Sequence, residues 1–254
     1  MRPLVTLWVG DALGSLERAC LKSMVRQGHD VTLYSYGTPE GIPQGVSRAD
    51  GCEILPETSI FRNPEGSVAL FSDWFRYELL RRGAGTWIDT DVYLVAPVDM
   101  DAPNLFAEQA PGVLNNAILR LPPDSPLLPE LLAVFERGEV PAWLPMRRKT
   151  AAHLRRAFSG GAAIPRLPWG STGPHALTAL ARKHGLFQQA LPVDVFYPVP
   201  WRKAAWIVDP SISLTDVVTP RTVGVHLWNE CIRSFKDTPA AKGSFLDRLQ
   251  QEGR

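Results

Sequence analysis

The sequence predicts an α/β fold in which a mostly parallel sheet carries helices on both faces. Within residues 4–37, an apolar run is followed by an amphipathic segment and then by a second apolar run. A strand, helix and strand within about 35 residues form a right-handed unit whose two strands are parallel. Strand-like and helix-like segments continue to alternate along the chain, which is typical of a sheet covered on both faces.

The first unit spans residues 4–37. Residues 4–10 (LVTLWVG) predict a buried strand that ends at Gly10, and residues 30–37 (DVTLYSYG) predict its parallel neighbour. Between them, residues 15–28 predict a helix that stops at Gly28, a common residue just beyond a helix end. One face of this helix carries the apolar residues Leu16, Ala19, Cys20 and Met24.

The later elements follow the same signals. Residues 67–83 predict a helix that ends at Gly83, with an apolar stripe formed by Phe71, Trp74, Phe75 and Leu79. Residues 86–95 (TWIDTDVYLV) predict the strand after it. Further segments are the apolar run 113–119, helices at 127–138 and 171–185, a basic segment at 146–158, and strands or extended segments at 193–200 and 222–230. Because no Gly- or Ser-rich linker interrupts the chain, we expect a single domain over residues 1–254.

The composition indicates a soluble globular enzyme, with 45% hydrophobic and 21% charged residues. A net charge of +1 gives no reason to expect a nucleic-acid partner. We expect no transmembrane segment, because no apolar run approaches the roughly 18 residues needed. The N-terminal segment reaches a charge too early for a secretory signal. The three isolated cysteines, Cys20, Cys52 and Cys231, fit a reducing cytoplasm, where we expect the protein to act.

Two aspartates interrupt the predicted strand 86–95. Asp89 and Asp91 stand one residue apart among apolar neighbours, although Asp is depleted from strands. A carboxylate in such surroundings must be paired, protonated or bound to a metal. Side chains two residues apart on an extended backbone point to the same side, with Cα atoms roughly 6.5 Å apart. At the end of a strand they can converge on one hard cation, which prefers oxygen ligands.

Several interpretations of this Asp-x-Asp pattern compete. The two carboxylates could cap backbone amides or pair with arginine in a turn. A calcium loop fails because Tyr93 and Leu94 stand where Asp or Asn and then Gly are needed. A phosphatase with Asp89 as nucleophile fits poorly, because Tyr93 replaces a small residue and the strand is not the first of the fold. A nucleotide-sugar transferase would use both aspartates to hold Mg²⁺ or Mn²⁺ against a diphosphate.

The helix before the strand adds a second polar pair. Asp73 and Arg76 are three residues apart and share one helix face, away from Phe71 and Phe75. Such a pair on a surface contributes only about 0.2–0.5 kcal/mol to helix stability and would be unremarkable alone. It is more specific in combination with the glycine-bearing turn, the apolar strand and the Asp-x-Asp pattern that follow it.

These residues carry a resemblance. The run Ser72-Asp73-x-x-Arg76-Tyr77, followed by residues 85–92 (GTWIDTDV), resembles the signature of the sugar-binding-region glycosyltransferases with a DXD motif. That family includes initiating mannosyltransferases, α-1,4-galactosyl- and N-acetylglucosaminyltransferases, capsular polysaccharide synthesis transferases and, more remotely, large glucosylating bacterial toxins. Two positions depart from the signature: Ala84 stands where the first glycine is usual, and Trp87 stands where tyrosine is usual.

The resemblance implies a glycosyltransferase-A type fold with a Rossmann-like, mostly parallel sheet. Residues 1–95 would form the donor half, ending in the DXD motif, and residues 96–254 the acceptor half and a closing C-terminal segment. It also implies a hexosyltransferase with Mn²⁺ or Mg²⁺ as cofactor. The enzyme would move a hexose from a nucleotide-sugar, a UDP-sugar in preference to a GDP-sugar, to a glycan or glycolipid acceptor. Retention of anomeric configuration and a role in polysaccharide or capsule biosynthesis are further expectations.

The resemblance assigns roles to individual residues, reinforced by weaker matches at "LWVGD", "NNAIL", "TGP" and "HLWNE". It implies a metal site formed by Asp91, Asp89 and His226, with Asp91 as the direct ligand and Asp89 binding the ribose or the metal through water. The catalytic residues would be Asp89, Asp91 and Arg76. Donor binding would involve Trp8, Asp73, Arg76, Asp89, Asn115, Asn116, Gly173 and Trp228.

Two alternatives remain open at this stage, and a second Asp-x-Asp pattern needs an interpretation. The departures at Ala84 and Trp87 leave room for a non-catalytic nucleotide-sugar or carbohydrate-binding relative. The basic run Arg147, Arg148, Lys149, Arg155 and Arg156 is interpreted as a solvated helix face. The other interpretation is an acceptor-side or membrane-surface patch, which would associate the cytoplasmic protein with a membrane. The second Asp-x-Asp, Asp99-Met100-Asp101, follows Pro97 without a helix pair before it, and we expect no metal role for it.

Overall fold

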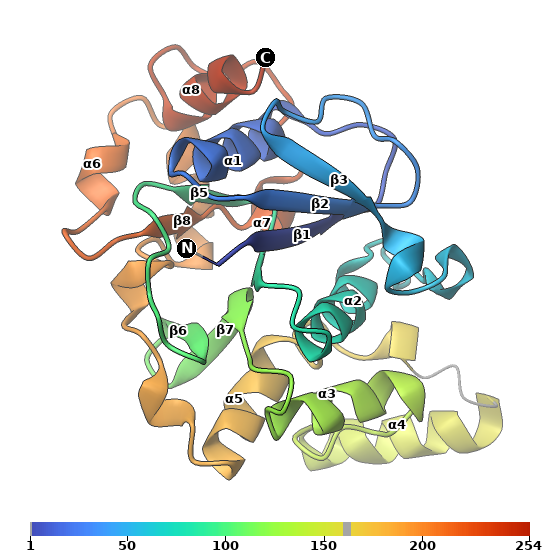
Figure 1. Ribbon diagram of the computed structural model, residues 1–254. Coiled ribbons are helices and arrows are strands. Elements are labelled where there is room, and N and C mark those ends of the chain that lie inside the picture. The colour runs from blue at the N-terminus through green and yellow to red at the C-terminus, as the bar shows by residue number, and fades with distance from the viewer. Residues whose placement is uncertain (1, 160–163) are drawn as a thin grey trace.

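The computed structural model describes residues 2–159 and 164–254, and its centre is a six-stranded sheet (Figure 1). The strand order is β3-β2-β1-β4-β7-β6. The first four strands in this order are parallel, and β7 and β6 continue the sheet in antiparallel fashion. Their bounds are Leu4–Trp8 (β1), Val31–Ser35 (β2), Val46–Asp50 (β3), Thr86–Ile88 (β4), Leu105–Ala110 (β6) and Val113–Arg120 (β7). The predicted α/β class, with a mostly parallel sheet and helices on both faces, is confirmed.

The opening βαβ unit forms as predicted. Strand β1 runs parallel to β2 in a register that pairs Leu4 with Val31 and Trp8 with Ser35. Helix α1 (Ser15–Arg26) connects them, and all four residues of its predicted apolar face are fully buried. A regular hydrophobic period therefore sufficed to place these elements.

The remaining helices lie close to the predicted ranges where their apolar period is strong. Helices α2 (Ala69–Arg81), α3 (Leu127–Glu136), α4 (Met146–Ser159) and α5 (Pro174–Lys183) correspond to the four later helical predictions. The short helices α6 and α7 and the C-terminal α8 were not predicted. They span Leu214–Val217, Asn229–Ile232 and Phe245–Glu252. Strands β3 and β6 were also missed, since each carries polar residues where a clear alternation is needed.

Two predicted strands require correction. Residues 86–95 form two short strands, because the chain turns at Asp89 and only residues 92–94 resume a strand, β5 (Val92–Leu94). Strand β5 leaves the main sheet and pairs with β8 (Gly224–His226). Residues 193–200 are not a strand: they begin with a 3₁₀ turn, Val193–Val195, in a segment whose prolines at 192, 198 and 200 cannot donate to a ladder.

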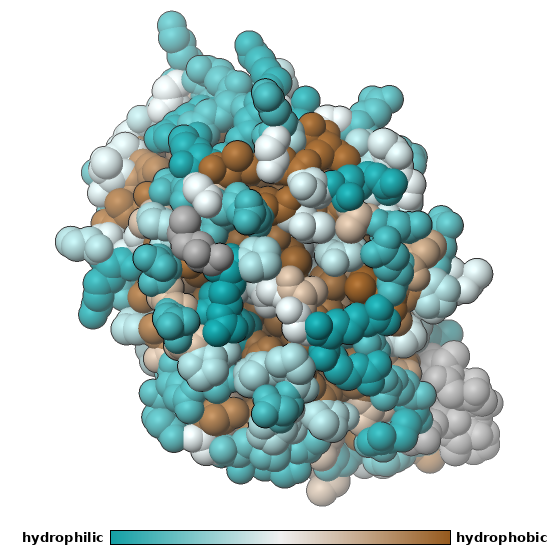
Figure 2. Space-filling model, viewed as in Figure 1, coloured by the Kyte–Doolittle hydropathy of each residue, from teal (hydrophilic) through white to brown (hydrophobic). Residues whose placement is uncertain are grey.

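The sheet separates two hydrophobic clusters. Along β1, Leu4 packs with α1 and α8 on one face, whereas Val5 packs with α2, α3 and α5 on the other. A parallel strand covered on both faces is expected to be apolar on both sides. The surface seen in Figure 2 mixes hydrophilic residues with scattered hydrophobic ones, as is usual for folded proteins. No helix in residues 2–159 or 164–254 is long and apolar enough to cross a membrane.

The turn into β4 contains two glycines with positive φ, Gly83 and Gly85, and Gly85 is the one packed against backbone. Gly85 has φ of +144°, and a Cβ built on it would lie 2.5 Å from the carbonyl oxygen of Pro3. Because that oxygen belongs to the backbone and accepts the amide of Thr86 at 2.9 Å, it cannot move away without loosening the sheet. Gly185 also has a positive φ, +68°, but a Cβ there would meet nothing within 4 Å.

We predict that Gly85→Ala lowers the free energy of unfolding by about 3 kcal/mol or more, through backbone strain and steric overlap together. Gly185→Ala serves as the control, with a loss of about 1–2 kcal/mol from the left-handed backbone alone. Urea denaturation of both variants measures the difference. Equal losses would contradict the assignment of a steric role to Gly85.

Candidate functional site

A cleft of about 920 Å³ opens at the carboxyl ends of β1 and β4. Open α/β sheets bind ligands at this end of their strands. One wall comes from Trp8 at the end of β1 and from polar residues of α2, and another from the turn at Asp89 and from residues 226–237. The cleft therefore gathers segments from both halves of the sequence.

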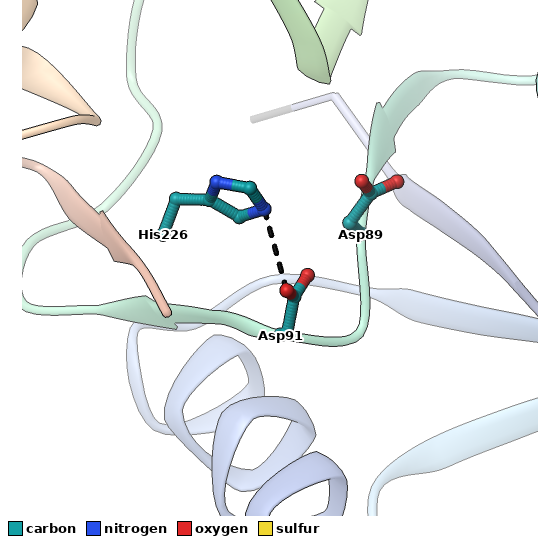
Figure 3. A group of neighbouring side chains, drawn as sticks. All are labelled: Asp89, Asp91 and His226. Carbon is teal, nitrogen blue, oxygen red and sulfur yellow. Dashed lines mark ion pairs between the residues drawn. The ribbon is translucent and has the colours of Figure 1, made fainter. Parts of the chain in front are cut away.

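Asp89, Asp91 and His226 converge in this cleft (Figure 3). One ligand atom from each residue lies within 4.8 Å of the others. Asp89 follows β4, Asp91 precedes β5, and the antiparallel pairing of Val92 with His226 brings the imidazole beside Asp91. The predicted ligand set is thus assembled in space, although β8 lies more than 130 residues further along the chain.

Asp91 and His226 form a buried acid–imidazole pair. The Nε2 atom of His226 lies 3.3 Å from Oδ2 of Asp91, and the same oxygen accepts the backbone N–H of Asn229 at 2.8 Å. Burial alone would raise the pKa of Asp91, but His226 and the Asn229 amide outweigh it and lower that pKa. Burial alone would lower the pKa of His226, and the charge of Asp91 raises it instead. The pair therefore favours a carboxylate beside a protonated imidazole.

Asp89 is fixed by two N–H donors. Its Oδ1 accepts Nη2 of Arg76 at 2.7 Å and the indole Nε1 of Trp87 at 2.6 Å. Burial raises the pKa of Asp89, the guanidinium of Arg76 opposes this change, and the charge of Asp91 adds to it. The side chain of Asp89 is 27% exposed, so it remains accessible from the cleft.

Arg76 is buried between two carboxylates rather than lying on a helix surface. Its side chain is 4% exposed and pairs with both Asp73 and Asp89. Its guanidinium also lies 4.7 Å from the ring centre of Trp87, a cation–π arrangement. Burial alone would lower the pKa of Arg76, but the charges of Asp89 and Asp73 outweigh burial and raise that pKa above its usual value. The guanidinium is therefore permanently charged and held in one orientation.

Asp73 has three side-chain donors. Besides Arg76, it accepts Nδ2 of Asn116 at 2.8 Å and the hydroxyl of Thr172 at 2.6 Å. The carbonyl of Thr172 in turn accepts the hydroxyl of Tyr77 at 2.6 Å. Because these residues come from α2, β7 and the start of α5, the network fixes three elements around the cleft.

The other predicted donor-binding residues occupy different parts of this region. Trp8 and Trp228 both line the cleft. Asn115 also lines it, but its amide is engaged by Gln109 and its carbonyl oxygen by the N–H of Ala117. Gly173 lies behind Asn116, since a Cβ on Gly173 would approach the Asn116 side-chain oxygen to 2.9 Å. Gly173 therefore contributes by allowing close packing and is not part of the cleft lining.

Trp228 has a strained backbone. Its φ of 57° is the one positive value at a non-glycine position in the described part of the chain. The indole Nε1 donates to the carbonyl of Val199 at 2.8 Å, and the ring packs against His226 with centroids 4.3 Å apart. Such strain persists only where surrounding contacts impose it, and it is common at ligand sites.

Several buried polar atoms of the cleft residues have no partner within the described residues. They are Thr6 Oγ1, Trp8 Nε1, Arg76 Nε, His226 Nδ1 and Asn229 Oδ1. Buried polar groups are nearly always satisfied in native proteins, by protein or by ordered water. These five atoms are themselves enclosed, so ordered water beside the cleft would satisfy them.

The sequence did not predict the residues that hold Asp91 in place, namely Asn229 and its partner Glu17. Asn229 holds Asp91 through its amide, and its side chain donates to Oε1 of Glu17 at 3.3 Å. Glu17 is fully buried on α1 and also pairs with Lys236. The available signal was a carboxylate adjoining the apolar face of α1, since position 17 is three and seven residues from Cys20 and Met24.

No protein-family model matches this chain, and no curated protein sequence matches it. Among solved structures, the chain is similar to the "PaToxG Glycosyltransferase", with a TM-score of 0.49 and 11% sequence identity. The similarity covers 72% of this chain and 68% of that one.

We predict that Asp73→Asn lowers the free energy of unfolding by about 3 kcal/mol, because it removes a counter-charge from a buried guanidinium. The control is Glu136→Gln on α3. This change removes a surface carboxylate that lies 2.8 Å from Arg81, which is on α2 like Asp73. That change should cost no more than about 1 kcal/mol. Urea denaturation at neutral pH compares the two variants, and similar losses would show that the Asp73–Arg76 pair is not effectively buried.

Proposed function

We propose that this protein is a metal-dependent glycosyltransferase that moves a hexose from a nucleotide-sugar to a glycan or glycolipid acceptor. The observation that carries the proposal is the convergence of Asp89, Asp91 and His226 within 4.8 Å in a cleft. The same cleft contains the buried Asp73–Arg76 pair. These are the groups that the resemblance to DXD-motif glycosyltransferases implies, and their convergence supports the proposal.

The donor set of this cluster fits a divalent cation. Two carboxylates and an imidazole suit Mn²⁺, and carboxylates with water suit Mg²⁺. The Nε2 atom of His226 faces Oδ2 of Asp91 at 3.3 Å and would bind the ion as a neutral imidazole, because the ion displaces the proton from a ligating histidine. Asp89 has a second oxygen beyond the one bound by Arg76 and Trp87. Asp89, Asp91 and His226 would hold the ion. When bound, the ion would act as a Lewis acid that offsets charge on the leaving diphosphate.

The remaining residues would bind and orient the donor. Arg76 lines the cleft, and its guanidinium would donate to a sugar hydroxyl. Asp73 is held in place by Asn116 and Thr172 and would accept from a second hydroxyl. Trp8 would stack on the base and Trp228 would close over the donor. The volume of about 920 Å³ lies within the range of small-molecule sites.

The finer assignments extend the same proposal. Residues 1–95 would bind the donor, with a UDP-sugar preferred over a GDP-sugar, and residues 96–254 would form the acceptor half and the closing segment. Retention would let the acceptor hydroxyl attack on the face of the leaving group and pass its proton to a phosphate oxygen. We therefore assign no protein base. The protein would act in the cytoplasm in polysaccharide or capsule biosynthesis.

We predict that Asp91→Asn lowers Mn²⁺-dependent donor hydrolysis by more than about a hundredfold, since loss of an outer-shell partner alone costs up to that factor. It should also abolish the stabilisation by UDP with Mn²⁺, which is about 2.7 kcal/mol at a hundred times Kd. The matched control is Asp101→Asn in the second Asp-x-Asp. Asp101 is exposed, and its partner Arg2 lies at a distance of 3.9 Å, so both readouts should stay unchanged. An active, metal-stabilised Asp91→Asn protein would overturn the proposal.

We further predict that UDP-hexoses with Mn²⁺ raise the melting temperature more than GDP-hexoses do, and that neither acts without metal. A thermal-shift panel of both sets measures this. Stabilisation without donor turnover would favour a non-catalytic binding protein. A phosphorylated Asp89 formed without any nucleotide would favour a phosphatase.

A further inference from the structure

Helix α4 exposes its apolar residues instead of burying them. Among residues 146–154, the one fully buried side chain is Ala152, whereas Met146 is 76% exposed and Leu154 is 55% exposed. Met146, Thr150 and Leu154 are spaced four residues apart and share one helix face. At 100° per residue, Ala152 lies on the opposite face, so the apolar stripe faces away from the protein.

Three arginines on or beside this helix have no acidic partner among the described residues. Arg147, Arg148 and Arg166 line a hollow of about 390 Å³, whose other lining residues are apolar: Leu144, Ala151, Ala152, Leu167 and Pro168. Within the described residues, none of the three arginines forms an ion pair, and no acidic residue lines the hollow. The sequence of 146–159 contains no Asp or Glu and adds Lys149, Arg155 and Arg156. The side chains of Arg155 and Arg156 lie outside those described.

These two features together indicate the chemistry of a partner. A helix that only faces water carries polar residues outward, and a helix stabilised by surface ion pairs needs acids beside its bases. The exposed side chains of Met146 and Leu154 would be stabilised by contact with an apolar phase, and the nearby arginines would be stabilised by contact with anions. The surface of an anionic bilayer offers both within a few ångströms of depth, and amphipathic basic helices of this kind lie in its plane.

A continuous surface leads from α4 to the cleft. A second hollow, of about 430 Å³, shares Arg166, Leu167 and Pro168 with the first. Trp169 is 62% exposed and lines both the second hollow and the cleft with the aspartates. A bilayer seated on α4 would therefore lie beside one entrance of the cleft.

We propose that α4 and residues 164–169 form a docking surface for an anionic membrane, and that this surface presents the cleft to a lipid-linked acceptor. The acceptor part rests on the proposed function, whereas membrane binding rests on α4 and its neighbours alone. The partner is a bilayer with anionic phospholipids. Met146, Leu154 and Trp169 enter its interface. Arg147 and Lys149, which flank the exposed stripe at 100° per residue, contact the headgroup phosphates, and Arg148 and Arg166 add positive charge beside them.

The test is co-sedimentation of the whole protein with vesicles of phosphatidylcholine, alone or mixed with about one third phosphatidylglycerol. We expect binding to the mixed vesicles, and loss of binding as salt shortens the reach of the charges. Each arginine or lysine near an anionic surface is worth about a fivefold change in partitioning. Arg147→Gln/Lys149→Gln should therefore bind about 25-fold more weakly, and Met146→Ser/Leu154→Ser should bind more weakly without a change in charge.

The matched control removes the same charge elsewhere. Arg48 lies on β3 and Lys242 precedes α8, at the end of the molecule away from α4 (Figure 1), and both are exposed. Arg48→Gln/Lys242→Gln should bind like the parent. Equal losses in the two double variants, equal binding to neutral vesicles, or no vesicle binding would each overturn the proposal. So would α4-dependent capture of soluble dextran sulfate without vesicle binding, which would assign the surface to a soluble polyanion.

The same assay separates this proposal from the enzymatic one. The vesicles require neither metal nor nucleotide, so Asp91→Asn should bind them like the parent protein. Vesicle binding without donor turnover would leave the docking surface in place and remove the glycosyltransferase assignment. Donor turnover without vesicle binding would support the glycosyltransferase assignment and overturn the docking surface.

Discussion

The buried guanidinium of Arg76 is the interaction on which this site depends. A cation that is 4% exposed is tolerable only with compensating charge and hydrogen bonds, and it receives both from Asp73 on its own helix and Asp89 after β4. Asp73 is bonded in turn to β7 through Asn116 and to the start of α5 through Thr172. One desolvated charge thus determines how four elements meet at the cleft.

The same charges suit the cluster to a cation. Asp73, Asp89 and Asp91 are three carboxylates within one connected set, and Arg76 and a protonated His226 supply at most two positive charges. When all three carboxylates are ionised, the set therefore keeps a net negative charge. Such a charge in partly desolvated surroundings is costly unless it is compensated, and burial, together with the charge of Asp91, keeps the pKa of Asp89 raised. A divalent ion between Asp89 and Asp91 would compensate this charge.

The sequence predicted the local features of this site better than its long-range contacts. Asp73, Arg76, Asp89 and Asp91 lie within 19 residues, so a helix period and a strand pattern place them together. His226 was identified by resemblance alone, because its position beside Asp91 depends on the pairing of β5 with β8. The break between β4 and β5 was missed because both flanking runs are apolar and strand-forming. Periodicity does not encode a turn held by tertiary hydrogen bonds.

The two departures from the family signature have physical explanations. Among the described residues, Trp228 alone has a positive φ without being glycine, so Ala84 adopts an ordinary backbone and the positive-φ positions of the turn are Gly83 and Gly85. Trp87 does two things at once: its indole N–H donates to Asp89 at 2.6 Å, and its ring faces the guanidinium of Arg76. Both contacts orient the groups that face the cleft. Neither departure removes one of the three clustered side chains Asp89, Asp91 and His226.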